Sequence, residues 1–148
     1  MPWTMTNMAM TADEILSLLG SQFPQAAAMG LKIDALEEGF IRVRLPTSEQ
    51  HLRPGGTLSG PTMMMLADTA MYFLVLAHIG PQPLTVTTSL NINFLKKPAP
   101  GDLVAQARML KLGARLAVGD VLMHSAATPS DIVAQATVTY SIPPPPEG

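Results

Sequence analysis

The chain has 148 residues, of which 47% are hydrophobic and 14% are charged, where an average globular protein has about 25% charged residues. This length fits one domain, and the apolar content excludes intrinsic disorder for most of the chain. With 9 basic and 11 acidic residues the net charge is -2, so nothing in the charge balance favours binding to nucleic acid or to an anionic membrane.

Cysteine is absent, which excludes disulfides, thiolate metal sites and cysteine nucleophiles. The histidines lie far apart, and no two of them have the spacing that places imidazoles on one helix face. We therefore expect no dedicated metal site. Because the first basic residue is Lys32, the N-terminus lacks the positive region of a secretory signal, and we expect a cytoplasmic protein.

The first predicted element is a short helix that follows an aperiodic stretch. Residues 1–10 show no hydrophobic periodicity and are expected to be flexible. Thr11 and Glu14 have capping-box spacing just ahead of Ile15, which predicts a helix start. Gly20 is the expected C-terminal stop of this helix.

A hairpin, a loop and a long apolar segment come next in the chain. From Leu31 onward apolar side chains alternate as far as Leu45, with a turn at Glu37-Glu38-Gly39, and this predicts a β-hairpin. Residues 46–60 are rich in Pro, Gly, Thr and Ser and indicate a loop. Residues 61–79 are the longest apolar stretch and predict a helix that is apolar on every side.

Strands fill the last third of the chain, and short turns between them indicate antiparallel pairing. They are predicted at about residues 84–95, 102–112, 115–126 and 132–142. A single domain is therefore expected over residues 11–142, followed by a flexible Pro-rich tail at 143–148. One helix serving one sheet gives an α+β fold, in which a curved antiparallel sheet wraps the long helix and a partner chain covers its open part.

Asp68 is the one formal charge in the long apolar helix. Removing a carboxylate from water without a partner costs several kcal/mol, so stability alone gives no reason for its position. One alternative is a solvated helix stripe, but its neighbours at helical spacing are Met64, Met65, Met71 and Tyr72. A transmembrane helix is the other, and Asp68, His78 and the β-rich remainder oppose it. Asp68 is thus the candidate catalytic residue.

The start of the same helix supplies a second candidate group. In Ser59-Gly60-Pro61-Thr62 a capping residue and a glycine precede a proline of the first turn, so the Gly60 amide has no partner within the helix. Such an amide can polarise a carbonyl or stabilise an oxyanion. By itself the pattern also fits a well-capped helix, and the interpretation depends on its pairing with Asp68.

Spacing along the helix makes a prediction about assembly. Gly60 and Asp68 are eight positions apart, or about 12 Å along the axis, so one helix cannot bring both groups to one carbonyl. Two antiparallel helices across a two-fold axis would place Gly60 of one chain opposite Asp68 of the other. The sequence therefore predicts a homodimer with shared sites.

Three segments resemble the hotdog-fold acyl-CoA thioesterases, most closely the phenylacetate-pathway (PaaI-like) type. These segments are Arg53-Pro54-Gly55-Gly56-Thr57-Leu58-Ser59-Gly60, Leu66-Ala67-Asp68-Thr69-Ala70 and Val86-Thr87-Thr88-Ser89-Leu90-Asn91-Ile92-Asn93-Phe94-Leu95-Lys96-Lys97-Pro98. With Gly101-Asp102-Leu103 after them, the resemblance covers about residues 25–142.

The resemblance implies a hotdog fold, a homodimer that can pair again into a homotetramer, and hydrolysis of a CoA thioester without a metal or cofactor. In the family, the acidic residue at the position of Asp68 activates water or attacks the thioester carbonyl. The backbone amide at the position of Gly60 polarises that carbonyl. Activation of water by Asp68 is the mechanism we expect here, with a hydroxyl of Thr69 or of the other subunit's Ser59 as hydrogen-bond donor to the carboxylate.

The chain departs from the family at the helix start, where Ser59-Gly60-Pro61 replaces a usual His-Gly-Gly. Arg53 replaces a common Asn and is a candidate for binding a substrate carbonyl or phosphate, or for stabilising the loop. Tyr72 is a candidate for the acyl lining, with plain core packing as the alternative. Basic residues that could meet the CoA phosphates, or only be solvated, are Lys96, Lys97, Arg108, Lys111 and Arg115.

Two other functions stay open from the sequence. The missing histidine and the proline at position 61 favour a non-hydrolytic protein that binds acyl-CoA or another small acyl ligand. A hotdog hydratase or dehydratase would need a histidine beside the acid, and His51 is the candidate for such a contact.

Overall fold

The computed structural model describes residues 8–47, 52–53 and 57–144 of the chain. The elements follow one another in the order α1 (Ala12–Gln22), α2 (Pro24–Ala27), β1 (Lys32–Glu37), β2 (Phe40–Leu45), β3 (Leu52–Arg53), β4 (Thr57–Leu58), α3 (Gly60–Ile79), β5 (Val86–Phe94), β6 (Leu103–Leu112), β7 (Leu116–Ser125) and β8 (Ile132–Ser141).

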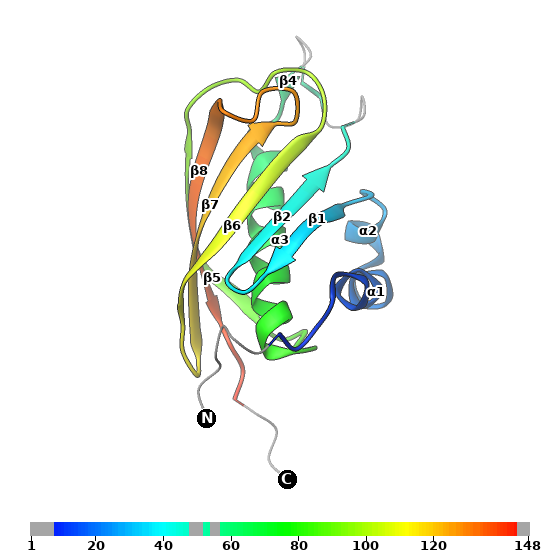
Figure 1. Cartoon of the computed structure of the whole chain (residues 1–148), viewed down its shortest axis with the longest axis vertical. Helices are drawn as coiled ribbons and strands as arrows, with labels where there is room; N and C mark the ends of the chain where they lie inside the picture. The colour runs from blue at the N-terminus through cyan, green and yellow to red at the C-terminus, as the bar shows by residue number, and fades with distance from the viewer. Residues whose placement is uncertain (1–7, 48–51, 54–56, 145–148) are drawn as a thin grey trace.

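Six strands form one antiparallel sheet in the order β1-β2-β6-β7-β8-β5, and β3 and β4 form a separate two-stranded ladder. The large sheet curves around α3 (Figure 1). The predicted α+β architecture and antiparallel pairing are therefore confirmed. The two edge strands of the sheet are β1 and β5.

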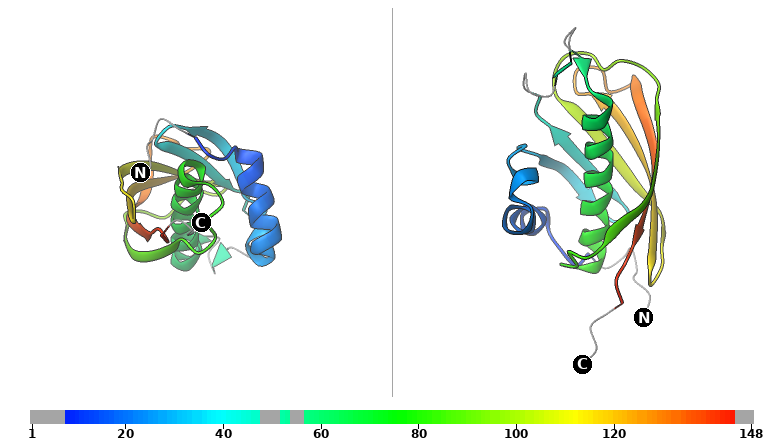
Figure 2. Two further views of the ribbon diagram at one scale, coloured as in Figure 1. Left: turned by 90° about the horizontal axis from the view of Figure 1, so that it is seen from below. Right: turned by 180° about the vertical axis from the view of Figure 1, so that it is seen from behind.

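The sheet covers one side of α3, while α1 and α2 lie beside the helix near β1 (Figure 2). Most of α3 is buried, and the buried side chains of the sheet strands complete one core around it. By length and composition α3 is apolar enough to cross a membrane, but 72% of its apolar window is buried inside the domain. Packing against the sheet accounts for this composition.

The less buried positions of α3 form one continuous stripe that includes Met64, Asp68 and Tyr72. These positions recur at helical spacing. Asp68 and Tyr72 lie toward β5 and β8 at the edge of the sheet, whereas Met64 is 41% exposed. The side of α3 opposite the sheet is largely uncovered by the other described helices and strands (Figure 2). One face of the central helix is therefore open in the single chain, as the sequence predicts.

The N-terminal helix agrees with the prediction at its start and differs at its end. Both halves of the capping box between Thr11 and Glu14 are formed. The predicted stop at Gly20 is wrong, because α1 continues to Gln22. The residue that ends it is Phe23, which precedes Pro24 and has φ -137°, since a residue before proline avoids the helical region.

Several other boundaries follow from local chemistry. The turn of the predicted hairpin contains Gly39 with φ 71°, and Gly80 ends α3 with φ 90°, a region that glycine enters without steric cost. The four predicted C-terminal strands are confirmed as β5 to β8. Within the stretch expected to be flexible, the amides of Ala9 and Met10 both donate to the carbonyl of Ala77, and Met10 is buried.

Candidate active site

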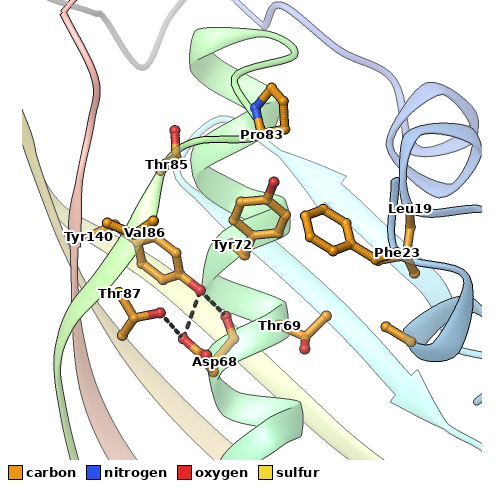
Figure 3. A pocket seen from close by; sticks show the side chains of 11 residues that line it. Leu19, Phe23, Asp68, Thr69, Tyr72, Pro83, Thr85, Val86, Thr87 and Tyr140 are labelled. Carbon is orange, nitrogen blue, oxygen red and sulfur yellow. Dashed lines mark hydrogen bonds between the residues drawn. The ribbon is translucent and has the colours of Figure 1, made fainter. Parts of the chain in front are cut away.

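Asp68 lies in the middle of α3 and accepts hydrogen bonds from two strands of the sheet. Its Oδ1 atom accepts from the Thr87 hydroxyl at 2.7 Å and from the Tyr140 hydroxyl at 2.7 Å. The Tyr140 hydroxyl also lies 2.9 Å from the main-chain carbonyl oxygen of Asp68. Figure 3 shows these contacts, with Thr87 on β5, Tyr140 on β8 and the carboxylate between them.

The sheet register explains why both donors reach the same oxygen. Thr87 and Tyr140 are direct cross-strand partners in the β5–β8 ladder, and partners of this kind are close neighbours in a sheet. Tyr140 is 3% exposed, so its position is determined by the core. The carboxylate is thus held by a preformed pair of side chains.

A cavity of about 440 Å³ opens beside Asp68. It is lined by Leu19, Phe23, Ala26, Asp68, Thr69, Tyr72, Pro83, Thr85, Val86, Thr87 and Tyr140. The ring of Tyr72 stacks on that of Tyr140 at 5.8 Å and meets that of Phe23 edge-on at 6.0 Å. The cavity therefore has aromatic walls and one carboxylate, that of Asp68.

The two tyrosines of the cavity stay protonated at neutral pH. Burial, followed by the negative charge of Asp68, raises the pKa of Tyr140. Burial also raises the pKa of Tyr72. Both phenols are therefore neutral groups that can donate a hydrogen bond, and neither is an acid that loses its proton under ordinary conditions.

Gly60 lies at the first residue of α3, about two helical turns from Asp68. It lines a second cavity of about 530 Å³, whose lining consists of Leu58, Gly60, Pro61, Met63, Phe94, Leu95, Lys96, Lys97 and Pro98. A Cβ atom added at Gly60 would lie 3.3 Å from Cζ of Phe94, so glycine lets the ring approach the backbone. The two cavities have no lining residue in common.

Neither the Ser59 nor the Thr69 hydroxyl donates a hydrogen bond to the Asp68 carboxylate in the single chain. Ser59 is the N-cap of α3, and its hydroxyl accepts from the Thr62 amide. The Thr69 hydroxyl donates to the Met65 sulfur at 3.5 Å, although the side chain lines the Asp68 cavity. A contact from Ser59 of another subunit stays a prediction.

The predicted substrate-binding residues separate into groups. Tyr72 lines the Asp68 cavity, whereas Lys96 and Lys97 line the Gly60 cavity, where Lys96 also pairs with Asp131 at 2.7 Å. Arg115 lies at neither cavity, and its Nε donates to the Ile142 carbonyl at 2.7 Å.

The backbone of Arg53 pairs with that of Thr57, and its side chain lies outside the described part of the structure.

Thr87 and Tyr140 are the two site residues that the sequence reasoning missed. A signal for Tyr140 was present, because it is the one polar side chain on the inward-facing series of the last strand, which is Ile132, Ala134, Ala136, Val138, Tyr140 and Ile142. No comparable signal marks Thr87, which lies in a run of polar strand residues.

Neither described histidine reaches the Asp68 cavity. His78 is buried and its Nε2 accepts from the Gly39 amide, whereas His124 is buried in β7 against Gln106. His51 lies outside the described residues. Within the described ranges there is no group of three or more His, Asp or Glu side chains placed to hold a metal ion.

A long helix wrapped by a curved six-stranded antiparallel sheet is the hotdog fold, and here the helix carries a carboxylate at a cavity. The sequence profile described as the Thioesterase superfamily matches residues 55–132. The chain belongs to this superfamily, so the predicted resemblance is confirmed.

Similar proteins agree with this assignment. A candidate thioesterase from Silicibacter sp. TM1040 has a crystal structure with a TM-score of 0.85, at 48% identity over 93% of this chain and 95% of that one. A candidate esterase from Pseudomonas aeruginosa is 30% identical over 89% of this chain and 90% of its own length. A mutant of the phenylacetic acid degradation protein PaaI from Thermus thermophilus has a TM-score of 0.69 at 27% identity, covering 81% of this chain and 99% of that one. These relatives support thioester hydrolysis in general terms.

Proposed function

We propose that this protein is an acyl-CoA thioesterase in which Asp68 activates water and the Gly60 amide of a partner subunit binds the oxyanion. The observation that carries the proposal is the position of Asp68. A carboxylate on the central helix faces an aromatic cavity and is held there by two hydroxyl donors. Placing a charged side chain at this position costs free energy and does not improve the packing of the core.

The reaction needs one base and one oxyanion donor. Asp68 accepts a proton from water as the water oxygen attacks the thioester carbonyl, and the carbonyl electrons move onto oxygen. When the tetrahedral intermediate collapses, the carbon–sulfur bond breaks and the thiolate of CoA takes up the proton from Asp68. General-base assistance of this kind contributes about 10²–10⁴ in rate.

Gly60 is suited to the second role because its amide lies ahead of the first amide that can bond within α3. The helix is 20 residues long, and its macrodipole adds positive potential at this end. One backbone donor to an oxyanion is worth about 10²–10³ in kcat. Pro61 removes the next amide but leaves that of Gly60 in place.

Two features support a dimer with shared sites. The single chain keeps Asp68 and Gly60 in separate cavities. The edge strand β5 has nine residues without a charge or a proline, although natural edge strands that stay unpaired are usually short, charged or interrupted. Pairing of β5 with its copy would continue the sheet and bring the open faces of two α3 helices together.

The two cavities suit the two ends of an acyl-CoA. The aromatic cavity beside Asp68 would take the acyl group. Lys96 and Lys97 at the Gly60 cavity would meet the phosphates, as cations bind phosphate oxygens by charge-assisted hydrogen bonds.

The experiment that tests the proposal is thiol release from a panel of short, aromatic and long acyl-CoAs. We expect turnover by the natural protein and a loss of at least about 10²-fold in kcat for Asp68→Asn. Asp13→Asn changes an exposed carboxylate of α1 and is the matched control, with unchanged turnover.

Retained turnover in Asp68→Asn would refute the role of Asp68. Binding of acyl-CoA by calorimetry without thiol release from any substrate would instead identify the protein as an acyl-ligand binder.

A further inference from the structure

We propose that Tyr140 is a positioning residue that assigns separate roles to the two oxygens of Asp68. With Thr87 it holds Oδ1, so that Oδ2 is the oxygen that takes the proton from water. This inference rests on the proposed hydrolysis for its catalytic meaning. Its structural content, that the Tyr140 hydroxyl holds a charged carboxylate in one orientation, can be measured separately.

The hydrogen bonds to the Asp68 carboxylate are distributed unevenly over its two oxygens. Both hydroxyl donors reach Oδ1, at 2.7 Å each. Among the residues that the structure describes, none donates a hydrogen bond to Oδ2 of Asp68. A general base needs a free lone pair within reach of water, and Oδ2 is the atom that retains it.

Tyr140 contacts two hydrogen-bond acceptors of Asp68. The same hydroxyl lies 2.7 Å from Oδ1 and 2.9 Å from the main-chain oxygen of Asp68. The terminal torsion of an aspartate is otherwise soft and broadly distributed. Because the Tyr140 hydroxyl contacts both the main chain and the side chain of Asp68, it restricts this torsion. It therefore determines the direction in which Oδ2 points.

Tyr140 is fixed by its surroundings in the core. The residue is 3% exposed, its ring stacks on Tyr72, and its strand β8 lies inside the sheet between β5 and β7. Thr87, by contrast, is an exposed residue of the edge strand. The two donors are therefore not equivalent, and the rigid one is Tyr140.

Apart from Asp68, no charged side chain of the described residues lines the Asp68 cavity, and this gives the Tyr140 hydroxyl a second role. The titratable side chains that line the cavity with Asp68 are Tyr72 and Tyr140, and the lining contains no Lys, Arg, His or Glu. The ionised carboxylate is therefore stabilised by neutral donors alone. The Tyr140 hydroxyl supplies one of the two hydrogen bonds that hold this carboxylate.

The test is Tyr140→Phe, which keeps the ring and removes the hydroxyl. We expect kcat to fall about 10- to 100-fold, the effect of one hydrogen bond to a charged group, with little change in KM. The ¹³C NMR resonance of the Asp68 carboxyl carbon should also move, because the carboxylate loses a hydrogen bond. A residue that only supports packing would lower stability without lowering kcat selectively or moving this resonance.

Thr139→Val is the matched control on the same strand. Its side chain lies on the opposite face of β8 from Tyr140, so kcat and the Asp68 carboxyl resonance should stay as in the natural protein. Should Tyr140→Phe fail to fold, 3-fluorotyrosine incorporated into a Tyr72→Phe background replaces Tyr140 alone, because the chain has two tyrosines. The fluorinated phenol is a stronger donor and should move the Asp68 carboxyl resonance from its position in the unfluorinated background.

The possible results separate the two proposals. An unchanged Asp68 carboxyl resonance and an unchanged kcat in Tyr140→Phe would overturn the positioning role while leaving the thioesterase proposal intact. Absence of turnover in the natural protein would overturn the thioesterase proposal, and the carboxyl resonance would still decide whether Tyr140 holds the carboxylate.

Discussion

Asp68 depends on neutral donors for its stabilisation, and this determines how the residue can function. A cation beside the carboxylate would compete for the oxygen that we propose accepts the proton, whereas two hydroxyls on Oδ1 leave the other oxygen free. Hydroxyl donors also add no second charge to the cavity, which suits the proposed acyl group. Asp68 is therefore a hydrogen-bond acceptor that two neutral donors hold in place without pairing its charge.

His78 leads to a residue-level prediction about pH. Burial lowers the pKa of His78, with the carboxylate of Glu38 opposing the shift. Its Nε2 accepts from the Gly39 amide, so the folded protein needs the neutral ring. The unfolded chain binds the proton more readily, with a pKa of about 6.5. The neutral His78 ring should therefore make its full contribution to stability above this pH. That contribution should be lost as the pH falls toward the lower pKa of His78 in the folded protein.

The measurement is chemical denaturation of the natural protein and of His78→Gln between pH 8 and about pH 5. Glutamine can still accept from the Gly39 amide and does not titrate. We expect the natural protein to lose more stability than the variant on acidification. Parallel losses in the two proteins would show that His78 is not the group responsible.

At the scale of elements, the contact between α3 and the sheet depends on one glycine. Gly119 of β7 faces Met71 of α3, and a Cβ atom there would overlap the methionine Sδ atom. The same atom would lie 2.6 Å from Cε of Met71 and 3.0 Å from the carbonyl oxygen of Arg108. Helix and sheet can approach this closely because the position has no side chain.

Gly119→Ala should therefore lower the free energy of unfolding by about 1–3 kcal/mol, because an overpacked core forces side chains or backbone to move. Gly20→Ala is the matched control. A Cβ at Gly20 meets nothing within 4 Å and the residue lies inside α1, so this change should raise stability by about 0.4–1 kcal/mol. Effects of the same sign in urea unfolding would contradict the packing argument.

At the scale of the whole molecule, the position of the two reactive groups decides whether one chain can be active alone. Asp68 and Gly60 lie in cavities without a common lining residue. A second copy of the chain could pair with the uncharged edge of β5 and at the same time cover the open face of α3. A shared site follows from this arrangement if the proposed roles are correct.

Complementation tests the shared site directly. Asp68→Asn removes the base, and Gly60→Pro removes the amide hydrogen at a helix position where proline is tolerated. Each variant alone should be inactive. A refolded equimolar mixture should recover about a quarter of the natural activity, since half of the randomly formed dimers contain one intact site of two.

Sites contained within single chains would give no recovery, because every chain in the mixture carries a defect. Size-exclusion chromatography of the mixture is the control for subunit assembly, and the half-exposed Phe94 ring next to Gly60 has room to shift for the added proline ring.

Local patterns in the sequence were sufficient for most of the fold. Alternation of apolar residues predicted the strands, the capping box predicted the start of α1, and the long apolar run predicted a central helix that carries Asp68. These features depend on interactions within a few residues, where periodicity and turn chemistry act directly. The end of α1 was mispredicted at Gly20, because a glycine permits a helix stop without requiring one.

Tertiary structure alone decided what surrounds Asp68. Thr87 and Tyr140 are far from it in the sequence, and they reach one oxygen through the register of β5 with β8 and the curvature of the sheet around α3. Periodicity assigns a side chain to a face but does not say which residue of another element lies opposite. The sequence therefore determined which residue carries the charge, and the packing of sheet on helix determined how that charge is held.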